Sequence, residues 1–597
     1  MDLAATRRTN DIEDWLDAME EKLLRWDPER LVSWDAESIE ASEYLQAIDE
    51  VRRFTEDQET LQSNNVRLQE NENLSRAHSI LQMAMARLED EFAHLLIQHR
   101  QPLELDHTSL WTVEEDVVED YSNNSFNDES LEFKHQIDSA RSSERFVIDL
   151  IEPNVIADLK SIADAMFMSN YDKECCQAYI SIRKDVLDEC LSVLHVEKLS
   201  IEEALTIDWD VFSTKIKKWN RAMKVYIRVY LASERSLCDQ IFGDLSKSVS
   251  ETCFLDASKG TMLQLLNFGE AISIAPPSSE RIFRLLDMYE CLAVLMPDVR
   301  DLFPEESGSD ILSGCHGVLW RLGDSIRATL SEFKNAIKKE TSTIPFAGGS
   351  VHHLTRYVMN YINVLTEYRE TLDLLLGGQD AKEAAPLSED SGELGSFSSI
   401  SPLGHCLMSV TSVLETKLHG KSMMYTDASL QHFFMMNNIC YMVKKVKESD
   451  LREMLGDDWI RAHNVKFRQH AMHYERISWN PILSFLKDDG IFSQGSSHPS
   501  KTVLKERFKC FNLAFEEIYK TQTSWQTYDG QLREDLRISI SLRLLQAYRT
   551  FTGRYQGYLD GVRHREKYIK FCQDDLQDYL LDLFEGSAKS IHIPRRR

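Results

Sequence analysis

The chain is poor in the two residues that most often interrupt helices, with only 23 glycines and 13 prolines among 597 residues. Both shares lie below those of average proteins, and so few interruptions over such a length favour long helices. The pattern also lacks paired strands and any alternation of strands with helices, which argues against nucleotide-binding α/β folds. The composition therefore predicts an all-α fold. The chain is also too long for one hydrophobic core, so several helical domains are expected.

Cysteine usage and hydropathy exclude several classes of protein. The 11 cysteines are scattered without a C-x-x-C pair, so the sequence spells out neither a disulfide framework nor a zinc ribbon, and it suits a reducing compartment. No apolar run reaches the length of a membrane-spanning helix, and the N-terminus lacks the apolar stretch of a signal peptide. Neither end carries a lipidation motif. We expect a soluble cytosolic protein that meets membranes only peripherally.

Motifs for catalysis and for metal binding are also missing. The sequence has no phosphate-binding loop, no G-x-S-x-G elbow and no H-E-x-x-H zinc motif. The pattern closest to a metal site places His470 and His473 on one face of a helix, but Glu475 points elsewhere on that helix. We interpret these histidines, and the weaker pair His352 and His353, as packed or exposed side chains. The prediction is a protein without cofactor, metal or enzymatic activity.

Charge is distributed very unevenly along the chain. The formal net charge is −29, and residues 1–150 hold 14 Lys and Arg against 36 Asp and Glu, whereas residues 500–597 hold 18 against 13. So small and local a basic excess makes nucleic acid a poor partner. Basic residues nevertheless gather near the C-terminus, at Arg563, Arg565, Lys567, Lys570, Arg595, Arg596 and Arg597. Because like charges so close repel one another, the first four predict a site for an anionic lipid surface, and a solvated surface is the alternative.

Apolar periodicity indicates helices almost throughout, with polar stretches that divide the chain. Residues 104–132 are acidic and aperiodic and predict a solvated loop, and the Gly- and Ser-rich stretch 376–404 predicts a flexible insertion. These breaks predict five segments: N-terminal helices that could bind a partner (1–60), a first helical bundle with an acidic loop at 104–140 (61–205), a second bundle (206–343), a third bundle with the loop 376–404 (344–500), and a C-terminal bundle with a basic, membrane-facing tip (501–597).

Individual helices can be predicted from their apolar stripes. The stripe of Asp11–Trp26 predicts an amphipathic helix that either docks on the body of the protein or pairs with a coiled-coil partner. Leu81, Met85, Leu88 and Phe92 lie three and four residues apart and predict one apolar helix face. A similar stripe in the last domain contains Phe508, Phe511, Phe515 and Ile518, which we interpret as core packing rather than as a cofactor site.

Two helix ends can be predicted from capping residues. Pro276–Pro277 should end one helix, and Ser278 or Ser279 should cap the next. Near the C-terminus, Gln573–Glu585 should form the last helix, stopped by Gly586. The basic residues around Lys567 then precede this helix, on a turn or a short helix.

Several long stretches occur in an order that is typical of one family. They read AMARLEDEFAHLL, PFAGGSVHHLTRYVMNYINVL, MMNNICYMVKKVKESDLREMLGDDWI, FNLAFEEIYKTQTSWQTYDGQLREDLRISISLRLLQAYRTFTGRY, and EKYIKF followed by LLDLFEG. Together they resemble the seventy-kilodalton subunit of the exocyst, a vesicle-tethering complex, and in particular its plant branch. The matches extend over most of the chain, which makes the resemblance specific.

The resemblance implies an elongated all-α rod of consecutive helical bundles without enzymatic activity. It implies a tether that brings secretory vesicles to the plasma membrane in exocytosis and binds membrane rich in phosphatidylinositol bisphosphate through its C-terminal tip. The family's membrane-binding K-Y-I-K motif falls on Lys567 and Lys570. The implied partners are other exocyst subunits and, in some members, a Rho-type small GTPase. The implied location is the cytoplasm, peripherally at the plasma membrane or on secretory vesicles.

The sequence departs from the family pattern at a few positions. Phe571 follows the motif where the family usually has Tyr, and His353 stands at a position where Pro is common. The N-terminal coiled coil that longer members use for assembly is represented at most by Asp11–Trp26. These departures leave a second expectation open: a diverged helical scaffold that binds protein partners in autophagy or defence-related trafficking without an essential lipid step.

Overall fold

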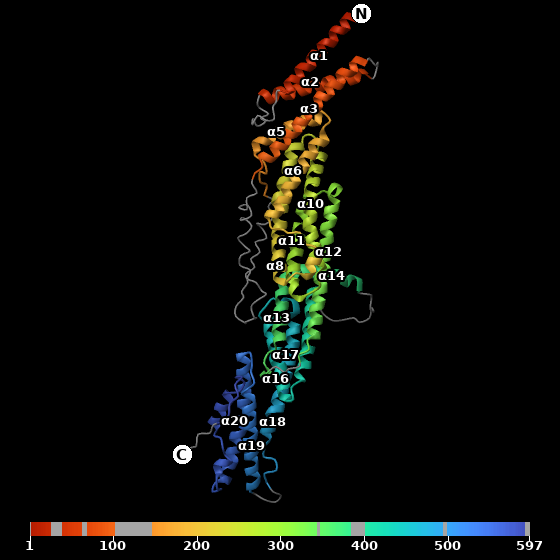
Figure 1. Cartoon of the computed structure of the whole chain (residues 1–597). Coiled ribbons are helices and arrows are strands. Elements are labelled where there is room, and N and C mark those ends of the chain that lie inside the picture. Colours follow the sequence, from red (N-terminus) through yellow and green to blue (C-terminus); the bar gives the residue numbers. More distant parts are fainter. Residues whose placement is uncertain are drawn as a thin grey trace. The chain divides into compact units, whose positions relative to one another are not determined.

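The computed structural model describes residues 2–24, 39–62, 68–101, 146–342, 347–383, 400–492 and 498–591. Within these ranges the regular structure is helical, and pairing of the β type is limited to three isolated bridges (Figure 1). The predicted all-α class is therefore confirmed. The predicted acidic loop at 104–132 and the terminal Arg595, Arg596 and Arg597 lie outside the described residues.

The helices form two compact units, Met1–Ala328 and Thr329–Arg597, and the boundary falls within helix α12. Unit 1 contains α1 (Asp2–Leu24), α2 (Ile39–Gln62), α3 (Leu68–Gln98), α5 (Pro153–Met168), α6 (Asp172–Val193), α7 (Ile201–Thr206), α8 (Trp209–Val225), the π-helix η1 (Tyr226–Leu231), α9 (Ala232–Phe242), α10 (Lys247–Ile274), η2 (Ser279–Arg281), α11 (Ile282–Leu302) and the start of α12 (Glu305–Lys339).

Unit 2 contains η3 (Ala347–Gly349), α13 (His353–Leu365), η4 (Thr366–Tyr368), α14 (Arg369–Glu383), α15 (Pro402–Ser422), α16 (Ala428–Lys447), α17 (Leu451–Ser478), α18 (Asn480–Ser484), α19 (Lys501–Gln522), α20 (Gly530–Tyr555), η5 (Gln556–Leu559), η6 (Arg565–Lys567) and α21 (Gln573–Leu581). The division into two units is coarser than the five segments expected from the sequence, which stay a prediction.

The N-terminal helix α1 packs on α2 and α3 within unit 1. Leu16, Met19 and Leu23 are buried, and the ring of Trp15 lies 5.1 Å from that of Phe54 in α2. The apolar stripe allowed either docking on the body of the protein or pairing with a coiled-coil partner, and in the structure the helix is docked. The stripe predicted for α3 is confirmed, since Leu81, Met85, Leu88 and Phe92 are all buried.

An ion pair lies in the core of unit 1, where α6 and α9 both pack on α10. Arg183 of α6 donates from Nη2 to Glu234 Oε2 of α9 at 2.7 Å, and both side chains are fully buried. The hydroxyl of Tyr179 donates to the other carboxylate oxygen of Glu234 at 2.8 Å. Because an isolated charge is costly to bury, each partner depends on the other.

The π-helix η1 holds the segment that follows the acidic stretch. The backbone N–H of Phe146 donates to the carbonyl of Arg228 at 3.3 Å, and that of Ile148 donates to Ser233 Oγ at 2.9 Å. A π-turn displaces its carbonyls from the regular helical ladder, which makes them accessible to a neighbouring segment. Residue 146 is thereby fixed at a point that directly follows α8.

Two adjacent buried asparagines organise the middle of unit 2. On α16, Asn437 Nδ2 donates to the carbonyl oxygens of Gly349 at 2.8 Å and Gln526 at 3.1 Å. Asn438 Oδ1 accepts from the backbone N–H of His352 at 2.9 Å. Gly349 has a φ of 65°, in the left-handed region that favours glycine, whereas an added Cβ would come closest to the flexible end of Leu430, so the backbone conformation favours glycine here. The segment from Gly349 to His352 is thus hydrogen-bonded to α16.

Helices α19, α20 and α21 share an aromatic core. Phe508 and Phe551 have ring centroids 5.1 Å apart, and Phe515 lies 5.4 Å from Phe571. Phe508, Phe511 and Phe515 are buried and Ile518 packs against them, which confirms that the predicted stripe is core. This core positions the segment between α20 and α21, which carries the predicted lipid-binding residues.

The structure corrects two predicted helix ends. Ser278 makes no side-chain capping bond, because the backbone N–H of Arg281 bonds to the Ser278 carbonyl at 2.9 Å in a 3₁₀ turn, and α11 begins only at Ile282. The last helix, α21, ends at Leu581 rather than at Glu585. There the chain turns away to pair with the α19–α20 connection, with the N–H of Phe584 donating to the Gln522 carbonyl at 3.1 Å.

The flexible insertion predicted at 376–404 is also shorter than expected. Helix α14 extends to Glu383, and α15 begins at Pro402, where Ser401 Oγ accepts from the N–H of Gly404 at 3.1 Å. Two glycines weaken a helix by about 1 kcal/mol each, but the following DAKE stretch consists mostly of good helix formers. Residues 384–399 lie outside the described residues.

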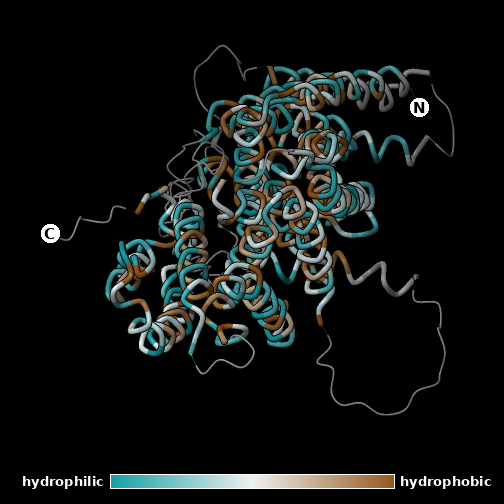
Figure 2. The backbone as a smooth tube through the Cα atoms, turned by 90° about the horizontal axis from the view of Figure 1, so that it is seen from below, coloured by the Kyte–Doolittle hydropathy of each residue, from teal (hydrophilic) through white to brown (hydrophobic). Residues whose placement is uncertain are grey.

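Hydropathy alternates along the helices rather than forming long apolar runs (Figure 2). Of the helices in the described ranges, none is long and apolar enough to cross a membrane.

Candidate functional site

The four predicted lipid-binding residues lie on the connection between α20 and α21, here called the basic loop (Arg563, Arg565, Lys567 and Lys570). After η5 the chain turns through Gly561 and His564, whose φ angles are 81° and 61°. The short 3₁₀ helix η6 follows, and the N–H of Lys567 bonds to the His564 carbonyl at 3.0 Å. The predicted turn or short helix ahead of the last helix is therefore what the structure contains.

Apolar and aromatic residues fix the basic loop to the C-terminal core. Phe571 is buried, and Tyr568 and Ile569 pack against the core at its margin. The loop backbone is held from both neighbouring helices: Asn512 Nδ2 of α19 donates to the Tyr568 carbonyl at 2.9 Å, and Tyr548 Oη of α20 donates to the Phe571 carbonyl at 2.7 Å. A phenylalanine at 571 fills this buried position without needing a partner for a hydroxyl.

The four cations of the loop fall into two classes. Arg565 Nη1 lies 2.9 Å from Asp560 Oδ1, and Lys570 forms an ion pair with Glu516 of α19. Arg563 and Lys567 are exposed and form no ion pair with any other residue in the described ranges. Arg563 and Lys567 therefore present their charge to solvent outside any ion pair, although Glu566 lies next to Lys567, whereas Arg565 and Lys570 already hold an acid.

Further charged groups surround the loop. Lys505 Nζ of α19 lies 5.6 Å from the ring centre of Tyr568, a cation that sequence reasoning missed because it is distant in the chain. Its only sequence signal is its place in a Lys501, Lys505, Lys509 series along α19. Glu566 accepts a hydrogen bond from its own backbone N–H, which holds the pKa of its carboxyl below the usual value, so it stays ionised.

The local charge balance limits what the loop can bind alone. Lys505 and the four loop cations are opposed by Glu516, Asp560 and Glu566. Each Lys or Arg near an anionic leaflet contributes roughly 1 kcal/mol, and each acid takes away a similar amount. A balance of about two positive charges gives a dissociation constant weaker than about 1 mM on a diffuse anionic surface. A ligand with concentrated charge, such as a bisphosphorylated head group, suits Arg563 and Lys567 better.

The histidines considered as a metal site are brought together by packing of α16 on α17. His432 Nδ1 lies 3.0 Å from His470 Nδ1, and the ring of His473 lies 5.0 Å from that of His432. Burial and the neighbouring histidines lower the pKa of His470 to about 4. Glu475 is held elsewhere, by Ser539 and Arg543 of α20. In the part of the chain that the structure describes, no group of His, Cys, Asp and Glu has the arrangement of a metal site.

The second histidine pair has a structural role. His352 Nδ1 accepts from the backbone N–H of Leu354 at 3.1 Å and so caps the N-terminus of α13. Burial, together with the adjacent His353, lowers the pKa of His352 to about 4, so the ring is neutral and able to accept. A capping role explains this histidine.

Fold and site together define an all-α protein of helical units with an exposed basic loop near its C-terminus. Two family models match the chain. The model for the C-terminal part of the Exo70 exocyst complex subunit matches residues 217–582, and the model for the Exo70 N-terminal part of this exocyst complex component matches residues 15–98. The chain belongs to the Exo70 family of exocyst subunits.

Curated relatives from Arabidopsis thaliana resemble the chain over most of its length. Exocyst complex component EXO70E2 is 37% identical over 579 residues, covering 96% of this chain and 88% of the relative. EXO70B1 is 34% identical and covers 86% of this chain and 80% of the relative, and EXO70A1 is 33% identical with 96% and 87% covered. The predicted family is therefore confirmed.

Solved structures of Exo70 from S. cerevisiae share the fold. One at 2.1 Å resolution has a TM-score of 0.59 at 15% identity, covering 97% of this chain and 99% of the other. A second has a TM-score of 0.60 at 14% identity and covers 95% and 99%. At this identity the likeness supports the helical-bundle fold only.

Proposed function

We propose that the protein is a non-enzymatic exocyst subunit that tethers secretory vesicles to the plasma membrane by binding phosphoinositides through the basic loop. Membership of the Exo70 family supports association with other exocyst subunits and a role in vesicle tethering. Attachment is peripheral, through the loop rather than through a spanning segment, and a Rho-type small GTPase is a further proposed partner.

The observation that carries the lipid proposal is the exposure of Arg563 and Lys567 on a loop with a fixed backbone. Hydrogen bonds from Asn512 and Tyr548 hold the loop, so its cations are presented without a cost for ordering the chain. Arg563 offers a fork of donors for phosphate oxygens, and Lys567 adds a compact charge. A phosphoinositide head group matches this pair.

Co-sedimentation with vesicles tests the proposal. The protein is mixed with phosphatidylcholine vesicles with and without phosphatidylinositol bisphosphate, at low and at high salt. We expect binding that requires the phosphoinositide, weakens with salt and is lost in Arg563→Glu/Lys567→Glu. The matched control is Lys447→Glu/Lys520→Glu, which changes the net charge equally at two exposed lysines of α16 and α19. Equal losses of vesicle binding in both variants would show that the basic loop is not the lipid-binding site.

The second function, a protein-binding scaffold without a lipid step, is favoured by one observation. Arg565 and Lys570 are already paired with acids, which halves the number of loop cations available to a membrane. This alternative is supported if vesicles never retain the protein while other exocyst subunits still co-purify with it from cells, in amounts that Arg563→Glu/Lys567→Glu leaves unchanged.

A further inference from the structure

Helix α8 carries a concentrated basic surface in an otherwise acidic protein. Its 17 residues include Lys215, Lys217, Lys218, Arg221 and Lys224 against the single acid Asp210. Three of these residues, here called the α8 basic face (Lys217, Lys218 and Lys224), are exposed and form no ion pair with any other described residue; Lys217 and Lys224 share one side of the helix, and Lys218 lies about 100° around it.

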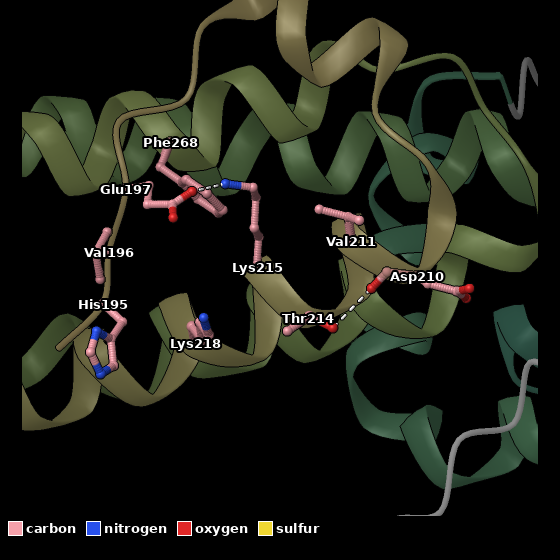
Figure 3. Close-up of a pocket in the computed structure, with 9 residues that line it drawn as sticks. All are labelled: His195, Val196, Glu197, Asp210, Val211, Thr214, Lys215, Lys218 and Phe268. Carbon is pink, nitrogen blue, oxygen red and sulfur yellow. Dashed lines mark hydrogen bonds and ion pairs between the residues drawn. The ribbon is translucent and has the colours of Figure 1, made fainter.

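A cavity of about 370 Å³ lies beside α8 and is lined by one lysine of the α8 basic face, Lys218. Figure 3 shows Val196, Val211 and Phe268 at its apolar walls, with Lys215 and Lys218 beside them. Lys215 is tied to Glu197 by an ion pair, which holds the pKa of that carboxyl below its usual value, whereas Lys218 acts on Glu197 only through its charge and forms no ion pair with a described residue. Val211 is about half exposed, at 47%. The cavity and the lysines together suit an apolar anchor that is followed by carboxylates.

One segment of the same chain has this chemistry. Residues 104–132 contain ten Asp and Glu and no Lys or Arg. Within them the sequence LWTVEEDVVED places Leu110, Trp111 and Val113 directly before the acids of residues 114–120. We propose that this segment binds in cis to unit 1, with its apolar residues in the cavity and its carboxylates on the α8 basic face.

The attachment point of the segment supports binding within one chain. The chain re-enters the described structure at Phe146, which is bonded to Arg228, three residues beyond the end of α8. From there to Val211 at the cavity, 17 residues along the helix, the distance is about 25 Å. The 32 residues between Val113, at the cavity, and Phe146 span about 28–34 Å as a flexible chain. Because the linker length matches the span, the effective concentration is near its maximum, on the order of 1 mM.

Strength and salt dependence follow from the contacts. One exposed ion pair strengthens an interaction by a factor of about 1.4 to 5, so three pairs contribute about 3- to 150-fold. At millimolar effective concentration even weak intrinsic binding keeps the segment bound for much of the time. Salt screens exposed pairs, so the bound fraction falls as ionic strength rises.

Zero-length carbodiimide cross-linking of the full-length monomer, followed by mass spectrometry, tests the proposal. We expect intramolecular cross-links between the α8 basic face and acids of residues 114–120, decreasing at high salt. Glu114→Gln/Glu115→Gln/Asp116→Asn should reduce their yield several-fold, since most of the reacting carboxylates are removed. The absence of such cross-links at low salt, or their occurrence only in dimers, would overturn the proposal.

A binding measurement provides the second test. A fluorescent peptide of residues 104–132 should bind full-length Glu114→Gln/Glu115→Gln/Asp116→Asn about tenfold more tightly than wild type, because the wild-type segment competes. Adding Lys217→Glu/Lys218→Glu/Lys224→Glu should abolish this binding. Lys173→Glu/Lys184→Glu/Lys247→Glu, at exposed lysines of α6 and α10, is the matched control and should leave it unchanged. Equal binding to wild type and to the neutralised protein contradicts occupation in cis. Lysine-dependent binding of phosphatidylserine vesicles in place of the peptide would instead identify a membrane surface.

Discussion

Replacing Glu516 by glutamine should strengthen binding of the protein to phosphoinositide vesicles, although the substitution lies outside the basic loop. Glu516 on α19 holds Lys570 in an ion pair, and each side chain is about one-third exposed at 32%. The amide keeps the shape of the carboxylate but removes its charge, which frees the lysine and removes an acid that an anionic surface repels.

The expected magnitude follows from one charge near the leaflet. A gain of roughly 1 kcal/mol corresponds to about fivefold tighter binding at low salt. The lost ion pair is worth at most about 1 kcal/mol to folding, because pairs that are partly exposed are screened by solvent. The melting temperature should therefore fall by only a few degrees while binding improves.

Vesicle co-sedimentation over a series of phosphatidylinositol bisphosphate contents measures the effect. Glu517→Gln removes the same charge from an exposed neighbour on α19 and should change binding less, because Glu517 has no partner in the loop. Combining Glu516→Gln with Lys570→Ala should cancel part of the gain. If Glu516→Gln binds no more tightly than wild type, Lys570 does not face the lipid and the charge balance derived for the loop is wrong.

Three further predictions concern stability and can be checked by denaturant unfolding. Glu234→Gln should destabilise the protein by about 3–5 kcal/mol, because it leaves Arg183 charged and buried; Arg183→Met/Glu234→Leu should cost much less. Phe515→Ala should cost about 3–5 kcal/mol, since a cavity replaces a buried ring between α19 and Phe571. Burial and the neighbouring histidines lower the pKa of His470 to about 4, so the unfolded chain, with a pKa near 6.5, binds the proton more readily. The contribution of neutral His470 to the free energy of unfolding is complete above about pH 6.5 and is lost as pH falls towards 4. The loss amounts to about 1–2 kcal/mol after solvent screening, and His470→Gln should make the free energy of unfolding depend less on pH in this range.

Features with a local period could be predicted from the sequence. The stripe of Phe508, Phe511 and Phe515 is buried as expected, and Lys567 is exposed on a turn ahead of the last helix. Both follow from spacing along the chain, because one face of a helix is determined by residues three and four apart. The identity of the family could be predicted because its motifs are long and retain their order.

Features that join distant segments could not be predicted in this way. Lys570 meets Glu516, 54 residues earlier, and His432 joins His470 across two helices. Periodicity places each residue on a face but does not say which face of which helix lies opposite. The early end of α21 has the same cause, since the competing partner of Phe584 is the carbonyl of Gln522. The charge balance of the basic loop therefore required the structure.

The buried amide of Asn437 has a consequence for how the chain is synthesised. Its two acceptors, the carbonyls of Gly349 and Gln526, are 88 and 89 residues away on opposite sides. While a ribosome is still producing α19, only the first acceptor has been made, and a buried amide that lacks a partner costs about 1–3 kcal/mol. The centre of unit 2 is therefore completed late in translation. A nascent chain whose Gln526 is still inside the ribosome should remain unpacked around Asn437 and expose its α16 surface to chaperones.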